Sequence, residues 1–273
     1  MRAEQDFDTE LAALRAAGRA FAVATVVRTL EATSAKPGAK ALVGADGTIL
    51  AGWVGGGCVR GAIGRAAREA VEDGQTRFLS LRPEELLEAE GVSPGEERAG
   101  VRFARNGCPS KGSMDIFVEP VLPRPVLQIC GAGPVALALA KLGASFDFDM
   151  RLAAPGLDHA PEGVSVSESY AFDTESDAGR FTVVATQGKG DEAALRAALS
   201  AGSGEYVAFV GSRRKFATLR ARLEADGVDP QALSAVRAPA GLHLHAITPD
   251  EIALSILAEI VSVRRGGQRE AET

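Results

Sequence analysis

A short apolar run followed by a glycine turn most strongly limits what this chain can fold into. Val126–Cys130 has the composition of a buried strand, and Gly131-Ala132-Gly133-Pro134-Val135-Ala136 leads from it into a helix-like segment. Phe181–Thr186 and Tyr206–Val210 are further strand-like runs, each followed by helix-like sequence. Strands that alternate with helices predict a parallel sheet with crossover helices.

The first half of the chain shows no such regular alternation. Its pattern predicts a helix over Asp6–Ala17, strands over Phe21–Val27, Ala41–Val43 and Thr48–Trp53, a helix over Val59–Asp73, and strands over Thr76–Leu81, Val101–Ala104 and Ser113–Glu119. Asp46-Gly47 indicates a hairpin between the second and third of these strands. This half is therefore expected to be an α+β domain.

Three spaced prolines, Pro120, Pro123 and Pro125, separate the two patterns. Spaced prolines favour an extended connector and break regular structure. We therefore expect an α/β protein with an N-terminal α+β domain at residues 1–123 and a C-terminal Rossmann-like domain with a parallel sheet at residues 124–273.

Charge and hydropathy narrow the range of partners. Lys and Arg number 30 against 36 Asp and Glu, a net charge of −6, and no basic stripe is interleaved with aromatic residues, so no nucleic-acid partner is expected. The apolar runs fall short of the roughly 18 residues that a membrane span needs. No membrane span is expected, and the acidic start favours a cytoplasmic protein.

Gly55-Gly56-Gly57-Cys58 comes where a loop becomes a helix. The unsatisfied amides and the dipole of a helix start lower the pKa of a thiol, which favours a nucleophile or a soft-metal ligand at Cys58. The alternative is a buried cysteine behind a structural loop. Cys108 lies in a second loop of small residues, which by itself is typical of an ordinary hairpin, and Cys130 ends an apolar strand, as a core thiol would.

Two features of the C-terminal half bear on phosphate binding. Gly131 and Gly133 fit a dinucleotide-binding turn, but Ala154 stands where such a domain places a ribose-binding acid, so the glycines could serve the turn alone. Ser212-Arg213-Arg214-Lys215 begins a helix, where cations are unfavourable unless an anion or an acidic partner compensates them. This indicates a phosphate site, with a solvated cationic turn as the alternative.

His243 and His245 would share one face of an extended segment. Imidazoles suit zinc or copper, but two ligands do not complete a metal site. Surface or packing roles are therefore the favoured interpretation.

Five sequence blocks, taken in order, resemble the XdhC/CoxI family of maturation factors for molybdenum hydroxylases. They are Pro37-Gly38-Ala39-Lys40, Gly55-Gly56-Gly57-Cys58-Val59, Gly131-Ala132-Gly133-Pro134-Val135-Ala136, Gly211-Ser212-Arg213-Arg214-Lys215, and Thr248-Pro249-Asp250-Glu251-Ile252-Ala253 with Ala258-Glu259-Ile260-Val261. The chain departs from the usual family pattern at His243 and His245, where the family shows Asp and Gly, and at Ala154, where an acid is common.

The resemblance implies a two-domain chaperone rather than an enzyme. Such a protein would bind molybdenum cofactor (molybdopterin), protect it during sulfuration by a cysteine desulfurase and deliver it to a client molybdenum hydroxylase. Cys58 is then the implied metal and cofactor contact, Cys108 a weaker one, and a homodimer is expected. The rival hypotheses are an NAD(P)-dependent oxidoreductase and a scaffold that only bridges desulfurase and client.

Overall fold

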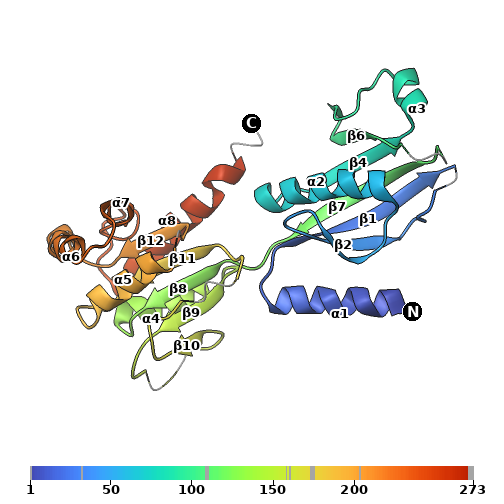
Figure 1. Cartoon of the computed structure of the whole chain (residues 1–273). Coiled ribbons are helices and arrows are strands. Elements are labelled where there is room, and N and C mark those ends of the chain that lie inside the picture. The colour runs from blue at the N-terminus through green and yellow to red at the C-terminus, as the bar shows by residue number, and fades with distance from the viewer. Residues whose placement is uncertain are drawn as a thin grey trace. The chain divides into compact units, whose positions relative to one another are not determined.

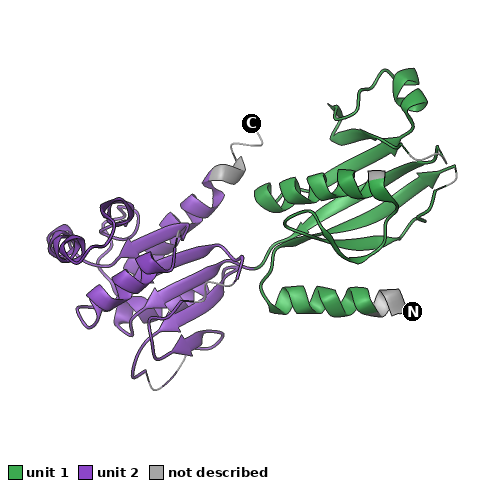
Figure 2. Ribbon diagram, in the orientation of Figure 1, with its two compact units in different colours: residues 1–123 green, residues 124–273 purple. Residues whose placement is uncertain are grey.

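The computed structural model describes residues 2–31, 33–107, 111–157, 159, 161–172, 176–202 and 204–269, and for Cys58 the backbone alone. The chain forms two compact units, residues 1–123 and 124–273 (Figure 2), and each unit is described by itself. The mixed sheet of the first unit and the parallel sheet of the second confirm the expected fold class.

The first unit is built around a seven-stranded sheet of order β3-β2-β1-β7-β4-β6-β5 (Figure 1). Its elements are α1 (Arg2–Ala16), β1 (Phe21–Leu30), β2 (Lys40–Gly44), β3 (Ile49–Gly52), α2 (Gly57–Asp73), β4 (Arg77–Arg82), α3 (Glu84–Ala89), β5 (Glu97–Arg98), β6 (Val101–Arg105) and β7 (Ser113–Val121). Helices α1 and α2 lie on opposite faces of the sheet.

The core of the first unit lies between α2 and the sheet. Ile63 and Ala66 of α2 are fully or almost fully buried against alternate residues of the central strands, such as Ala24 of β1 and Ile116 of β7. Only alternate strand residues pack against α2, because neighbouring side chains point to opposite faces of a sheet. Residues along these strands therefore alternate between buried and partly exposed positions.

The loop from Asn106 to Gly112 is not a hairpin, which corrects the interpretation from sequence. Strand β4 lies between β6 and β7, parallel to β6 and antiparallel to β7. The loop therefore joins two strands that are not neighbours in the sheet. Asn106 fixes its start, because its backbone N–H donates to the Arg82 carbonyl (2.7 Å) and its side chain to the Gly112 carbonyl (2.6 Å).

The second unit is a five-stranded, all-parallel sheet of order β10-β9-β8-β11-β12. Its elements are β8 (Val126–Cys130), α4 (Pro134–Gly143), β9 (Asp149–Ala153), β10 (Ser165–Ser167), β11 (Arg180–Val184), α5 (Asp191–Ser200), β12 (Tyr206–Phe209), α6 (Arg213–Ala225), α7 (Pro230–Ser234) and α8 (Pro249–Arg269). Helices α4 and α8 cover one face, and α5, α6 and α7 pack on the other.

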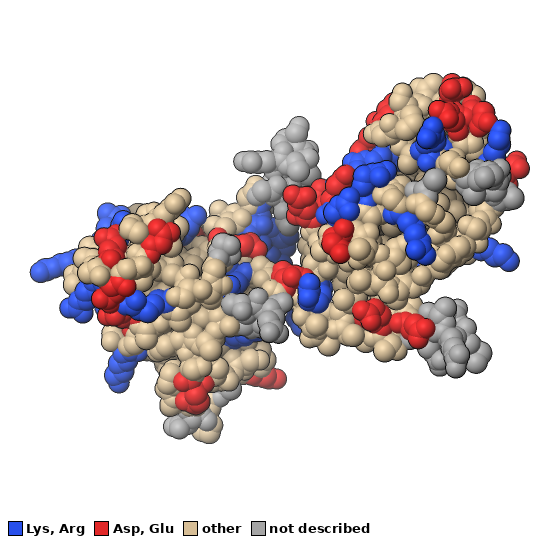
Figure 3. Space-filling model, viewed as in Figure 1, with Lys and Arg blue, Asp and Glu red and all other residues tan. Residues whose placement is uncertain are grey.

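The surface carries both signs of charge on each unit. Acidic and basic side chains are interspersed over the face that Figure 3 shows. Such a surface supplies no long-range field of one sign on that face. In the part of the chain that the structure describes, no helix is both long enough and apolar enough to cross a membrane.

Candidate functional site

The start of α2 has more open space than the fold requires. Gly55 has φ +132°, and a Cβ there would lie 3.2 Å from Val59, so the backbone itself calls for glycine. A Cβ on Gly56 or Gly57 would meet no atom within 4 Å. These two exposed glycines have no packing reason in this structure, and they leave the first turn of α2 open to a ligand.

The same helix start is electrostatically uncompensated. Gly56 caps α2 without a side-chain hydrogen bond, and the first turn holds no acidic residue. The free amides and the positive end of the helix dipole therefore remain available to an anion or a thiolate. The backbone of Cys58 lies in this turn, whereas its side chain is outside the described part of the structure.

Strand registers place the two cysteine loops at one end of the first sheet. Leu30 pairs with Ser113, and Arg82 pairs with Arg105, so these residues mark the same sheet end. Asp73, at the far end of α2, forms an ion pair with Arg77 at the opposite end of the sheet. The start of α2 therefore lies at the end where Gly107 and Lys111 flank Cys108, although residues 108–110 are outside the described residues.

A cavity runs along α2 from this end of the unit. Positions 62, 65 and 69 follow the helical spacing of one face. Ala62, Arg65 and Glu69 line a cavity of about 530 Å³, together with Arg102 and Phe103 of β6. Arg102 forms an ion pair with Glu69, and the hydrogen bond that it donates to this carboxylate raises the pKa of its guanidinium. Arg65 forms no ion pair among the described residues.

In the second unit, the glycine turn after β8 is tightly packed. Gly131 has φ +125°, and a Cβ there would lie 2.5 Å from the Ala185 carbonyl, so the close approach of the β11 loop requires glycine. A Cβ on Gly133 would lie 2.6 Å from the side chain of Gln187. The Gln187 amide thus lies against the turn, near the start of α4, where a dinucleotide-binding domain would hold a pyrophosphate.

The end of the second strand of this sheet lacks an acid, as the sequence indicates. Strand β9 ends at Ala153, and the following Ala154 is buried in the core. The neighbouring strand supplies a carboxylate instead, since Glu168 accepts a hydrogen bond from the Gly156 N–H (2.9 Å). The glycine turn therefore lies in a Rossmann-like sheet without the usual ribose ligand on β9.

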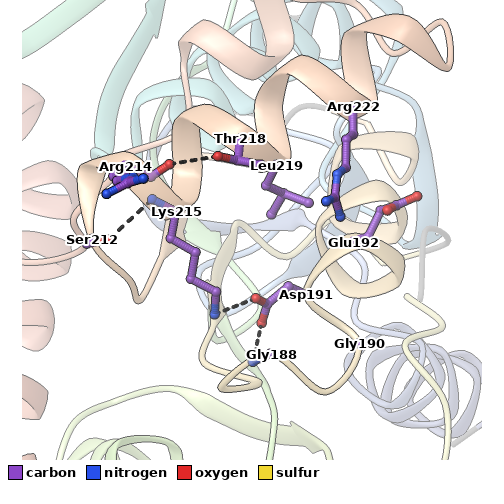
Figure 4. A pocket seen from close by; sticks show the side chains of 10 residues that line it. All are labelled: Gly188, Gly190, Asp191, Glu192, Ser212, Arg214, Lys215, Thr218, Leu219 and Arg222. Atoms are coloured by element: carbon purple, nitrogen blue, oxygen red, sulfur yellow. Dashed lines mark hydrogen bonds and ion pairs between the residues drawn. The ribbon is translucent and has the colours of Figure 1, made fainter.

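Two of the predicted cations, Arg214 and Lys215, line a pocket between the start of α5 and helix α6 (Figure 4). It has a volume of about 600 Å³ and is lined by Gly188, Gly190, Asp191, Glu192, Ser212, Arg214, Lys215, Thr218, Leu219 and Arg222. Ser212 caps α6 by accepting a hydrogen bond from the Lys215 N–H (3.2 Å). Arg213, predicted with them, does not line this pocket.

Asp191 organises the pocket, and sequence reasoning missed it. Its carboxylate accepts hydrogen bonds from the Thr186 hydroxyl and the Gly188 N–H (2.9 Å), and it pairs with the Lys215 ammonium at 2.6 Å. Figure 4 shows Lys215 reaching across from α6 to this residue. The sequence feature that could have indicated the role of Asp191 is the run directly after a strand, Thr186-Gln187-Gly188-Lys189-Gly190-Asp191.

Lys215 is therefore compensated by an acid, whereas two arginines are not. Arg214 and Arg222 form no ion pair with any described residue, and Glu192 pairs with Arg196 at 3.3 Å. In Figure 4, Arg222 extends towards the Glu192 side of the pocket. Two free guanidinium groups beside a helix start make this pocket suited to a phosphate group.

The carboxylate of Asp191 predicts a specific acid sensitivity. Burial alone would raise the pKa of Asp191, but the hydrogen bonds from Lys215, Thr186 and Gly188 outweigh burial and lower it. A lowered pKa stabilises the fold above the unfolded value of about 4, and this contribution is lost as the pH falls through the lower folded value. We expect Asp191→Asn to lower the free energy of unfolding by about 1–3 kcal/mol at pH 7.

Denaturant unfolding of both proteins at pH 7 and near pH 3 measures this effect. The difference between wild type and Asp191→Asn should shrink in acid, because the contribution of the carboxylate falls as the pH drops below the unfolded pKa of about 4 towards the lower folded pKa. A difference that stays constant across this range would show that the charge of Asp191 does not contribute.

Cys130 has no part in these sites. It is fully buried and free, and burial raises the pKa of its thiol to about 12. A thiol with such a pKa stays protonated at neutral pH and is unreactive. The expectation of a core thiol is confirmed.

Together, the fold and these sites define a class of α/β proteins in which a mixed-sheet unit with a glycine-rich helix start is followed by a Rossmann-like unit. Family models match both units: residues 14–82 match the XdhC and CoxI family, and residues 127–260 match the XdhC Rossmann domain. The chain belongs to the XdhC/CoxI family.

Two individual proteins show similarity over most of the chain. The protein YqeB of Escherichia coli (strain K12) is 29% identical over 94% of this chain, which spans 46% of the length of YqeB. A crystal structure from Bacillus halodurans, titled as a xanthine dehydrogenase, is 18% identical and covers 96% of both chains with a TM-score of 0.40.

Proposed function

We propose that this protein binds molybdenum cofactor and delivers it to a molybdenum hydroxylase, acting as a chaperone. The observation that carries the proposal is the pair of exposed glycines, Gly56 and Gly57, which no packing contact in the fold explains. They directly precede Cys58 at an uncompensated helix start, inside the segment that matches the XdhC and CoxI family.

The chemistry of the cofactor suits such a helix start. Molybdenum cofactor carries its metal on a dithiolene pterin with a terminal phosphate, and molybdenum is a metal for which a thiolate is a suitable ligand. The helix dipole and the free amides of α2 would favour the thiolate form of Cys58. The role of Cys58 is to hold the metal end of the cofactor, with Cys108 as a weaker second candidate.

The pocket of the second unit is proposed separately as a phosphate site. Ser212 offers a hydroxyl proton, since its oxygen only accepts from the Lys215 N–H, and Arg214 and Arg222 offer guanidinium groups that no described acid neutralises. A phosphate with two charges would be matched by these two cations.

The proposal includes three macromolecular partners. A client molybdenum hydroxylase receives the cofactor, a cysteine desulfurase supplies sulfur while the cofactor is bound, and a second copy of the chain forms a homodimer. Family membership supports the client, because the family consists of maturation factors for such enzymes.

An NAD(P)-dependent oxidoreductase is the alternative function. The sheet order β10-β9-β8-β11-β12 favours it, because it is the 3-2-1-4-5 order of dinucleotide-binding domains. The position of Gln187 against Gly133 and the buried Ala154 count against it.

The phosphate pocket predicts a charge-specific loss of affinity. Arg214→Ala and Arg222→Ala should each weaken binding of inorganic pyrophosphate by roughly 10- to 100-fold, because a hydrogen bond to a charged group contributes about 1.5–3 kcal/mol. Isothermal titration calorimetry on the full chain measures this change.

Arg213→Ala provides the matched control for this experiment. It removes the same charge from the helix turn that holds Arg214, without touching the pocket lining. Equal weakening by Arg213→Ala would mean that only the general surface charge attracts the anion, and the pocket would lose its proposed role.

A further inference from the structure

Two histidines lie side by side in a segment that the proposed function does not use. His243 and His245 precede α8, and both side chains are exposed. Their ring centroids are 4.4 Å apart, and the ring planes are inclined at 57°. The two imidazoles therefore meet each other at the surface instead of packing into the core.

Backbone hydrogen bonds hold this segment in place. The Gly241 N–H donates to the Glu259 carboxylate (2.9 Å), and the Leu242 N–H donates to the Ser255 carbonyl (3.1 Å), which ties the segment to α8. Between the histidines, the Leu244 N–H donates to the Leu242 carbonyl (2.8 Å). A pair of rings on such a fixed backbone loses little freedom when it binds a ligand.

The backbone of His245 is in an unfavourable conformation for a side chain. Its φ of +55° lies in the left-handed region, which costs a residue other than glycine about 1–2 kcal/mol. Neither imidazole forms a hydrogen bond or an ion pair with any described residue, so the contact between the two rings is the side-chain interaction observed for His245 among these residues. Strain of this kind concentrates at functional sites.

We propose that His243 and His245 bind a late first-row transition metal ion, with Cu(II) bound most tightly. Imidazole nitrogens suit these ions, and divalent copper leads their order of affinity. Two adjoining rings can supply the cis positions of a tetragonal copper ion. The described residues contain no cluster of three or more His, Cys, Asp or Glu that could hold a metal, so water or a partner supplies the remaining ligands.

Copper titration of the full chain, read by electron paramagnetic resonance, tests this site. Cys58→Ser and Cys108→Ser are placed in the background, because thiolates bind and reduce copper. The site predicts one Cu(II) with hyperfine coupling to two imidazole nitrogens. Loss of a residue that only hydrogen-bonds a metal ligand costs about 10- to 100-fold in metal affinity, and loss of a ligand itself should cost at least as much. His243→Ala or His245→Ala should therefore weaken copper binding at least tenfold.

Two further variants keep this test decisive. His245→Gly removes the ligand while suiting the left-handed backbone, so its loss of binding cannot come from misfolding. His159→Ala removes an exposed histidine elsewhere on the second unit and should leave copper binding unchanged. Unchanged affinity in the His243 and His245 variants, equal loss in His159→Ala, or coupling to a single nitrogen would overturn the site.

Discussion

Glu259→Ala is expected to lower the free energy of unfolding of the second unit by about 2–4 kcal/mol, because it leaves the buried Tyr206 hydroxyl and the half-buried Gly241 N–H without their acceptor. The Glu259 carboxylate accepts from the Tyr206 hydroxyl (2.6 Å) and from the Gly241 N–H (2.9 Å), and it pairs with Arg237 at 3.2 Å. Tyr206 and Glu259 are 3% and 8% exposed, so water cannot replace the lost acceptor.

These contacts tie α8 to the edge strand β12. Burial, followed by the hydrogen bond to Glu259, raises the pKa of Tyr206, so its hydroxyl stays protonated and remains a donor at neutral pH. The Gly241 contact is shared with the His243 segment. Loss of the carboxylate should therefore loosen the edge of the sheet and the segment before α8 together.

Glu259→Gln is the matched variant for this prediction. Its side-chain carbonyl can still accept from Tyr206 and Gly241, so most of the stability should return.

Both tyrosines, Tyr170 and Tyr206, lie in the second unit, and the single tryptophan, Trp53, lies in the first. Denaturant unfolding followed by tyrosine and tryptophan signals thus separates the units. The prediction would be contradicted if the Trp53 signal reported an equal loss of stability in the first unit. It would also be contradicted if Glu259→Gln were as unstable as Glu259→Ala.

Cys58→Ala is expected to abolish stoichiometric binding of molybdenum cofactor while leaving the fold intact. Alanine is the best helix former, so the backbone of α2 should tolerate the change. Cys130→Ala is the control, since it also removes one thiol but from the core of the second unit, where burial keeps the thiol protonated. Circular dichroism and the melting temperature report whether Cys58→Ala is folded.

Much of the fold could be predicted because its signals are local. Strand β8 is buried at every position, and α2 ends at Gly74 in a left-handed cap, so apolar runs and glycine stops mark these elements. The insertion of β4 between β6 and β7 could not be predicted, because strand order depends on contacts between distant segments. Short elements such as α3 and β10 also carry too few residues for a periodic signal.

Sequence reasoning named two cations of the candidate site, Arg214 and Lys215, but missed Arg222 and the acid Asp191, and it included Arg213, which does not line the pocket. Ser212 and Lys215 stand out at a helix start, whereas the role of Asp191 appears only when β11 and β12 lie side by side. His245 has a positive φ, so glycine would suit its backbone conformation. A single sequence cannot reveal this, because it does not show the φ angle. Gln187 was missed for a similar reason, since its contact with Gly133 joins two different loops.

The most direct test of the cofactor-carrier proposal is a titration of the purified apo-protein with molybdenum cofactor. Bound molybdenum and bound pterin are measured for wild type, Cys58→Ala and Cys130→Ala, with NAD(P)H as a parallel ligand. The proposal predicts stoichiometric binding by wild type and Cys130→Ala and its loss in a folded Cys58→Ala. Absence of cofactor binding by the wild type, with saturable binding of NAD(P)H, would contradict the carrier function and favour an oxidoreductase.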